Sequence, residues 1–167
     1  MFLILLAAAA LNPPNPMYGR ASVIDGDTLE IHGKRMRLWG IDAPEGRQTC
    51  TRAGATYRCG QEAANALAQI IGDVPVRCDP RGRPDRYRRI VAVCTVIHRG
   101  DCPDGAICDP AVLQLNAWLV ANGWALDWPR YSSGEYREQE AGARTTRLGI
   151  WAGEFTRPWE WRASQVR

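Results

Sequence analysis

Four acidic side chains lie close together in the first third of the chain. Asp25 and Asp27 lie at a turn before a strand-like run, and Asp42 and Glu45 follow the next run. Two carboxylates held side by side repel each other unless a cation lies between them. Hard oxygen ligands of this kind suit Ca²⁺ or Mg²⁺. The spacing therefore predicts a cation site formed by Asp27, Asp42 and a backbone carbonyl such as that of Ala43.

A predicted β-hairpin positions these carboxylates. Residues 27–32 and 36–41 have the pattern of two strands, and residues 32–34 have the composition of the turn between them. The far ends of an antiparallel hairpin lie together, so Asp27 and Asp42 are expected side by side. The alternative is that these aspartates only stabilise turns.

Glu45 and Arg37 are the other candidates for chemistry in this stretch. Glu45 lies three residues beyond Asp42 and can hold a water molecule and act as a general base. Arg37 is expected among core-facing residues, where an arginine needs a carboxylate or an anion as its partner. Asp27 or a substrate phosphate can fill that role.

A second basic region follows in the middle of the chain. Seven arginines fall between residues 77 and 99, with Asp79 and Asp85 among them. Arginine grips phosphate at two points, and a basic stripe near carboxylates suits a phosphodiester polymer. Tyr87 can stack on a nucleotide or form a hydrogen bond with it. The alternative for several of these arginines is a solvated loop.

The composition indicates one domain with a sizeable core. The chain has 167 residues, of which 46% are hydrophobic, and a formal net charge of +3. This modest excess does not by itself indicate a nucleic-acid partner. Of the 21 basic residues only Lys34 is a lysine, which fits phosphate binding but also fits a biased base composition of the gene.

The N-terminus is typical of an exported protein. Residues 1–11 are apolar and uncharged but shorter than the roughly 20 residues of a membrane span. They resemble the apolar part of a secretory signal, with a disordered tail as the alternative. We therefore assign residues 1–19 to a signal-like or disordered segment and residues 20–167 to the folded domain.

The six cysteines agree with export to an oxidising compartment, secreted or periplasmic. Two pairs flank short loops, and the third joins two strand-like runs. These predicted pairs are Cys50–Cys59, Cys102–Cys108 and Cys78–Cys94. A zinc site is the alternative, but the sequence has no pair of cysteines with zinc-ligand spacing.

The remaining pattern predicts an α+β fold. Further strands are expected at 20–25, 73–79 and 89–97, helices at 61–71, 111–122 and 134–148, and an insertion at 98–110. Five strands with a helix after the third match a five-stranded Greek-key β-barrel, the OB-fold, with about three helices. An SH3-like barrel is the alternative. The tryptophan-rich C-terminus is interpreted as packing against the domain.

Three motifs in order resemble the staphylococcal nuclease (thermonuclease) family. They are Ile-Asp-Gly-Asp-Thr at 24–28, Arg-Leu-Trp-Gly-Ile-Asp-Ala-Pro-Glu at 37–45 and Asp-Arg-Tyr-Arg-Arg at 85–89. Gly-Ile-Trp at 149–151 also looks like the end of that family's last helix. The resemblance runs from about residue 20 to 155, whereas the cysteines and the insertion look like features of an exported bacterial branch.

The resemblance implies an OB-fold nuclease that uses Ca²⁺ to cleave phosphodiester bonds in DNA and RNA and leaves 3′-phosphate ends. We expect it to act as a monomer without a stable protein partner. The implied roles are Ca²⁺ ligands for Asp27, Asp42 and the Ala43 carbonyl, general base for Glu45, phosphate contacts for Arg37 and Arg89, and nucleotide contacts for Tyr87 and Tyr131. Because Arg88 stands beside Arg89, either arginine can be the catalytic one.

Two other functions fit the same fold. One is a catalytically silent OB-fold module that binds nucleic acid or protein, and the other is a metal-dependent phosphodiesterase for smaller nucleotides. A silent module has little reason to retain all the residues that the resemblance marks as catalytic. The chain contains the full set: Asp27, Arg37, Asp42, Glu45 and Arg89.

Overall fold

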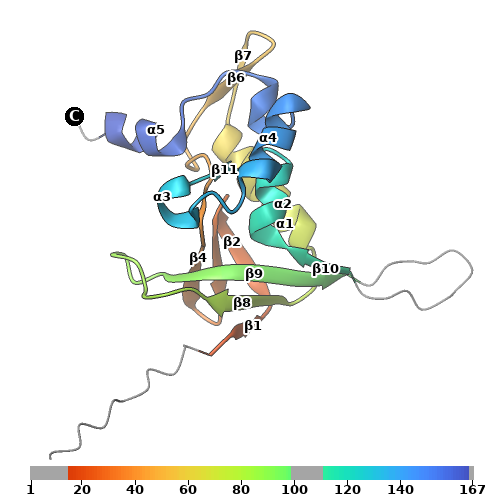
Figure 1. Ribbon diagram of the computed structural model, residues 1–167, viewed down its shortest axis with the longest axis vertical. Coiled ribbons are helices and arrows are strands. Elements are labelled where there is room, and N and C mark those ends of the chain that lie inside the picture. Colours follow the sequence, from red (N-terminus) through yellow and green to blue (C-terminus); the bar gives the residue numbers. More distant parts are fainter. Residues whose placement is uncertain (1–14, 99–110, 166–167) are drawn as a thin grey trace, which may run out of the picture.

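The computed structural model describes residues 15–98 and 111–165, which form an α+β fold (Figure 1). The strands are β1 (Met17–Gly19), β2 (Ala21–Asp25), β3 (Thr28–Ile31), β4 (Lys34–Leu38), β5 (Ile41–Asp42), β6 (Cys50–Arg52), β7 (Ala55–Tyr57), β8 (Val76–Pro80), β9 (Ile90–His98), β10 (Ala111–Gln114) and β11 (Leu126–Asp127). The helices are α1 (Cys59–Ile71), α2 (Leu115–Ala121), α3 (Pro129–Ser132), α4 (Arg137–Thr145), the 3₁₀ helix η2 (Gly149–Ala152) and α5 (Pro158–Ser164). Within these ranges no helix has the length and apolar character needed to cross a membrane.

The predicted hairpin is present as β3 and β4. Leu29 pairs with Met36 across it, and both side chains are fully buried. The turn residues His32 and Gly33 have φ angles of 50° and 71°, so both lie in the left-handed region that suits a two-residue hairpin turn. Lys34, expected in the turn, is instead the first residue of β4, and this strand ends at Leu38 rather than at the predicted residue 41.

The large sheet is mixed. Its strands follow the order β1-β8-β9-β4-β3-β2, with β4 and β9 parallel and the other neighbours antiparallel. Within the part of the chain that the structure describes, no pairing joins β1 to β2, so the strand path is open. The predicted closed five-stranded barrel is therefore not observed, although the α+β class is confirmed.

The three predicted helices are present as α1, α2 and α4, but the last two are shorter than expected, and α4 covers only Arg137–Thr145 of the predicted 134–148. Residues 111–114 form β10 instead of the start of the helix predicted at 111–122. They pair with residues 95–98 of β9, which extend beyond the part of β9 that pairs with β4. A free strand edge thus overrides the helical pattern of this segment. Figure 1 shows α1, α2 and α4 gathered on one side of the sheet.

Other elements have no counterpart in the sequence prediction. β1 pairs Met17, Tyr18 and Gly19 with residues of β8, so the fold includes part of the segment assigned to 1–19. α3, η2 and α5 follow β11 and carry much of the aromatic C-terminal segment. Trp151 and Phe155 there pack edge to face with ring centroids 5.0 Å apart, as expected for aromatic residues packed in the fold.

Two of the three predicted disulfides are present. Cys50–Cys59 joins β6 to the start of α1, and Cys78–Cys94 links the neighbouring strands β8 and β9, with Cα atoms 5.6 Å and 4.1 Å apart. Cys102 lies outside the described residues, as do its predicted partner Cys108, the rest of the insertion from residue 99 onward and residues 1–14.

Removing the Cys78–Cys94 bond should destabilise the domain. The bond closes a loop with a sequence separation of 16, for which the loss of chain entropy in the unfolded state corresponds to about 3 kcal/mol. The free energy of unfolding of the double variant Cys78→Ala, Cys94→Ala should therefore be lower by about 3 kcal/mol. Urea unfolding followed by tryptophan fluorescence would measure this difference. If the variant and the unmodified protein, both measured without reductant, have the same unfolding midpoint, the Cys78–Cys94 disulfide does not stabilise the domain.

Candidate active site

Three neighbouring strands bring the first set of predicted site residues together. Asp27 lies immediately before β3, Arg37 lies on β4 opposite Thr28, and Arg89 lies immediately before β9. Because β3, β4 and β9 are adjacent in the sheet, these side chains meet at one edge. Arg89 Nη1 donates a hydrogen bond of 3.2 Å to Thr28 Oγ1, which in turn donates one of 3.1 Å to Asp27.

A tight turn brings Asp42 to the same edge. Gly40, with a φ of +75°, lies between β4 and β5 at a position where a side chain would be strained and would crowd Ser132. Arg37 Nη2 donates a hydrogen bond of 2.6 Å to Asp42 Oδ1, and its Nη1 donates to Asp27. The buried arginine therefore has two carboxylate partners, as a desolvated cation requires.

The two aspartates are fully buried and are satisfied by neighbouring donors. The backbone N–H of Ala43 donates a 3.0 Å hydrogen bond to Asp27 Oδ2. Asp25 accepts a hydrogen bond of 3.1 Å from the backbone N–H of Asp27. Burial raises the pKa of Asp25 to about 6, and the negative charge of Asp27 adds to this shift. Asp27 and Asp42, which come from the two acidic turns, share Arg37 as a hydrogen-bond partner.

A residue that the sequence did not indicate completes this cluster. Arg162 on α5 donates hydrogen bonds of 3.0 and 2.8 Å to the two oxygens of Asp42, and one of 2.6 Å to Glu45 Oε1. Burial raises the pKa of Asp42, although the hydrogen bonds from Arg162 oppose this shift. Burial lowers the pKa of Arg162, but its bonds to Asp42 and Glu45 outweigh this, so the guanidinium stays charged. No motif or spacing marks Arg162, because 120 residues separate it from Asp42.

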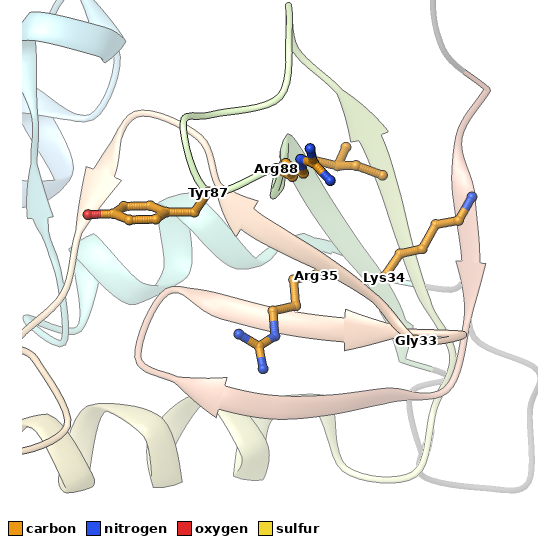
Figure 2. Close-up of a pocket in the computed structure, with 6 residues that line it drawn as sticks. Gly33, Lys34, Arg35, Tyr87 and Arg88 are labelled. Atoms are coloured by element: carbon orange, nitrogen blue, oxygen red, sulfur yellow. The ribbon is translucent and has the colours of Figure 1, made fainter.

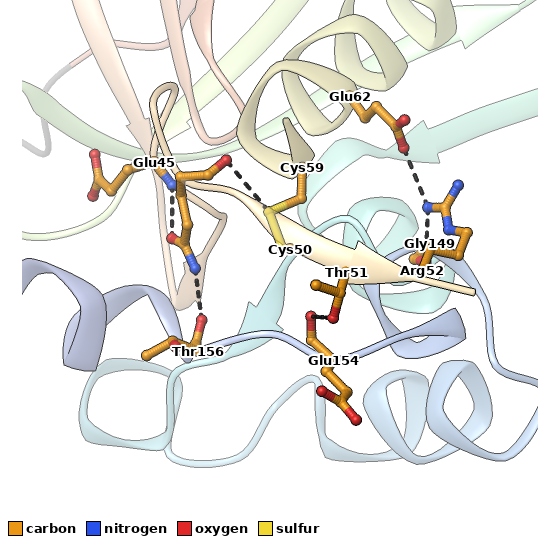
Figure 3. Close-up of a disulfide and its surroundings, with 10 residues drawn as sticks. Glu45, Cys50, Thr51, Arg52, Cys59, Glu62, Gly149, Glu154 and Thr156 are labelled. Carbon is orange, nitrogen blue, oxygen red and sulfur yellow. Dashed lines mark hydrogen bonds and ion pairs between the residues drawn. A yellow bond between two sulfur atoms is a disulfide. The ribbon is translucent and has the colours of Figure 1, made fainter. Parts of the chain in front are cut away.

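Gln48, also missed in the sequence, holds the loop that carries Glu45. Its side chain is fully buried, accepts a 3.2 Å hydrogen bond from the backbone N–H of Glu45 and donates one of 2.6 Å to the carbonyl of Thr156. Gly60 at the start of α1 packs so closely on the Glu45 carbonyl that a Cβ there would lie 1.8 Å from its oxygen. Figure 3 shows this loop beside the Cys50–Cys59 disulfide and the segment around Thr156.

The donor chemistry of this cluster suits a hard cation, but its present contacts leave no place for one. Both oxygens of Asp42 accept hydrogen bonds from arginine, and both oxygens of Asp27 are also hydrogen-bonded. Among the described residues no group of three or more His, Cys, Asp or Glu side chains is arranged to hold a metal ion. In this conformation the residues therefore do not fit Ca²⁺.

The structure separates the neighbouring arginines at 88 and 89. Arg89 Nε donates a 2.8 Å hydrogen bond to Asp85 Oδ2, and its Nη1 reaches Thr28 at the carboxylate cluster. Arg88 has a φ of 63°, so the backbone reverses there and the regular alternation of side chains is interrupted. Its side chain instead lines a surface pocket of about 300 Å³ beside Gly33 and Arg35 (Figure 2).

Two exposed tyrosines flank the cluster. Tyr87 is 63% exposed, and the Arg89 guanidinium lies 5.4 Å from the centre of its ring. Tyr131 is half exposed and lies edge to face against Trp128, with ring centroids 4.5 Å apart. Trp128 in turn lies 5.5 Å from the Arg162 guanidinium. Tyr87 therefore lies directly beside Arg89, and Tyr131 is connected to Arg162 through Trp128.

Residues 35–153 match the protein family described as staphylococcal nuclease homologue. The chain is 41% identical to the succinoglycan biosynthesis protein ExoI of Rhizobium meliloti (strain 1021) over 141 residues, which are 83% of this chain and 66% of that protein. It is 29% identical to the probable staphylococcal-like nuclease CAN3 of Oryza sativa subsp. japonica over 133 residues, 78% of this chain and 29% of that protein. An uncharacterized endonuclease of Escherichia coli is 26% identical over 153 residues, 87% of this chain and 85% of that protein.

The family match covers most of the chain and includes most of the predicted catalytic set. Arg37, Asp42, Glu45 and Arg89 all lie inside it. The chain spans about two thirds of the length of ExoI, and two of the three relatives are named as nucleases. This chain belongs to the family of staphylococcal nuclease homologues.

Proposed function

We propose that this protein is a Ca²⁺-dependent nuclease that hydrolyses phosphodiester bonds of DNA and RNA and leaves 3′-phosphate ends. One observation carries the proposal: the arginines and carboxylates named from the sequence meet at one edge of the sheet. They form a continuous series of contacts from Arg89 through Thr28, Asp27 and Arg37 to Asp42. The nuclease names of two relatives support the same reaction class.

The proposed roles divide between charge stabilisation and proton transfer. Arg37 and Arg89 would contact the scissile phosphate, where fixed positive charges stabilise the charge that develops on its oxygens. Glu45 would remove a proton from the attacking water, because its side chain is one-third exposed and can reach solvent. Tyr87 and Tyr131 would contact the nucleotide from opposite ends of the cluster.

Asp27, Asp42 and the Ala43 carbonyl would hold the cation. Bound Ca²⁺ would add positive charge that orients the phosphate and stabilises charge on it. In the described conformation Arg162 takes this position at Asp42, so the cation requires a rearrangement of that side chain.

The Arg162 contacts also favour a second candidate, the catalytically silent nucleic-acid-binding module. A general base that is held in an ion pair is not free to accept a proton, and Glu45 Oε1 accepts a 2.6 Å bond from Arg162. The two candidates differ in turnover: a silent module would bind polynucleotide without cutting it.

Digestion of plasmid DNA and of RNA should depend on Ca²⁺ and stop with a chelator. Products should become substrates for primer extension only after phosphatase treatment, because 3′-phosphate ends block a polymerase. Oligonucleotide binding without cleavage at any cation concentration would favour the silent module. Cleavage of a small nucleotide diester without cleavage of DNA or RNA would favour the smaller-substrate phosphodiesterase.

We further propose that the protein acts as a monomer in a secreted or periplasmic setting. The two disulfides support an oxidising compartment, where such bonds persist.

A further inference from the structure

Arg162 satisfies Asp42 and Glu45 as a bound cation would. Its guanidinium bonds to both oxygens of Asp42 and to one oxygen of Glu45, with three hydrogen bonds between 2.6 and 3.0 Å. The Asp42 side chain has no exposed surface, whereas the Arg162 side chain is 33% exposed. The arginine therefore reaches the buried carboxylate from the solvent side, which is also the side from which a cation must enter.

The charges of the cluster suit an exchange of one cation for another. Three carboxylates, those of Asp27, Asp42 and Glu45, face two guanidinium groups, those of Arg37 and Arg162. This leaves one net negative charge among these five residues. Without the Arg162 contact, the carboxylates of Asp27, Asp42 and Glu45 would face only the guanidinium of Arg37, which leaves two net negative charges. A divalent cation would balance these two charges.

The first turn of α5 and the segment before it are anchored to the domain independently of Arg162. Thr51 and Glu154 exchange two backbone hydrogen bonds of 2.9 Å, and Gln48 holds the Thr156 carbonyl (Figure 3). The Trp159 ring is stacked on Trp128, with centroids 6.0 Å apart. Figure 1 shows α5 at the edge of the molecule, away from the large sheet.

From this geometry we propose that Arg162 is an internal competitor of the divalent cation for Asp42, and that cation binding displaces it, together with α5, from Asp42 and Glu45. The proposal rests on the proposed Ca²⁺-dependent function. The contact with Arg162 keeps the buried Asp42 carboxylate paired, which avoids the cost of leaving it uncompensated. The same contact lowers the apparent affinity for the cation, because the cation must first replace it.

The competition can be measured by calorimetric titration of the full chain with Ca²⁺ in the absence of nucleic acid. The variant Arg162→Ala should bind Ca²⁺ about tenfold or more tightly than the unmodified protein, because no charge-assisted hydrogen bonds have to be broken first. Arg157→Ala is the matched control: Arg157 precedes the same helix, lies over the Trp159 ring, and among the described residues has one ion pair, with the exposed Glu160 at 3.9 Å. This control should keep the unmodified affinity.

Hydrogen exchange of the unmodified protein provides a second readout. A helix of seven residues is marginal once detached, so saturating Ca²⁺ should speed amide exchange in residues 158–164 while leaving α1 unchanged. Equal Ca²⁺ affinity of Arg162→Ala and the unmodified protein would overturn the proposal, as would unchanged exchange in α5. Absence of Ca²⁺ binding in both proteins would overturn it as well.

The outcomes also separate this proposal from the proposed function. Nuclease activity that persists in chelator would contradict the Ca²⁺ dependence, yet tighter Ca²⁺ binding by Arg162→Ala would still support the competition. Ca²⁺-dependent cleavage with equal affinities would support the function and reject the competition.

Discussion

Replacing Arg89 by alanine is expected to lower kcat for DNA cleavage by a factor of about 10² to 10³. Arg89 reaches the carboxylate cluster through Thr28 and is oriented by Asp85, whose two oxygens accept bonds from its backbone N–H and its Nε. A phosphate at this edge would lose a fixed positive charge at the point where negative charge develops. Initial rates on plasmid DNA at saturating substrate would measure the loss.

The neighbouring position offers a matched control. Arg88→Gly removes an equal charge one residue away. The backbone at this position has a φ of 63°, which glycine adopts more easily than any other residue, so the substitution should not strain the chain. Because Arg88 lines the surface pocket beside Gly33 and Arg35, this variant should keep kcat within a few-fold of the unmodified protein. A large loss in Arg88→Gly together with a small loss in Arg89→Ala would reverse the assignment.

Replacing Glu45 by glutamine is expected to lower kcat by a factor of about 10² to 10⁴. Glutamine has nearly the same shape and can still accept a hydrogen bond from Arg162, but it cannot take a proton from water. The loop should keep its position, because Gln48 holds the backbone N–H of Glu45 rather than its side chain. KM should change little, and thermal unfolding should confirm an intact fold.

Glu62→Gln is the control for this variant. Glu62 is 40% exposed and pairs with Arg52 at 3.2 Å, which makes it comparable in exposure and pairing to Glu45. It lies on α1 and contacts none of the cluster residues named above, so its substitution should leave the rate unchanged. A Glu45→Gln variant with nearly full activity would show that another group removes the proton.

The hairpin explains why the acidic half of the site could be predicted. Alternation of apolar residues with a turn at His32 and Gly33 specifies both strands and their register locally. Asp27 and Asp42 flank this hairpin, so their approach follows from chain geometry over a short distance in sequence. The disulfide between Cys78 and Cys94 was predictable for the same reason, since it joins two neighbouring strands.

Backbone conformation and strand edges account for what the sequence could not specify. Alternation could not choose between Arg88 and Arg89, because the positive φ of Arg88 interrupts the strand pattern just before β9. The helical spacing of residues 111–122 was correct only from Leu115 onward, because residues 111–114 meet the free edge of β9. Neither effect is encoded by the side-chain pattern of the segment itself.

The sequence by itself determined the acidic hairpin, the disulfide-linked strand pair and the resemblance to a nuclease family, since each depends on local patterns or ordered motifs. Only the tertiary structure placed Arg162 on Asp42 and Glu45 and moved Arg88 away from the cluster. The pairing of Arg162 with residues more than a hundred positions away depends on how the C-terminal segment is anchored at Thr51 and Gln48. Such contacts arise from packing between distant elements, for which a single sequence carries no local signal.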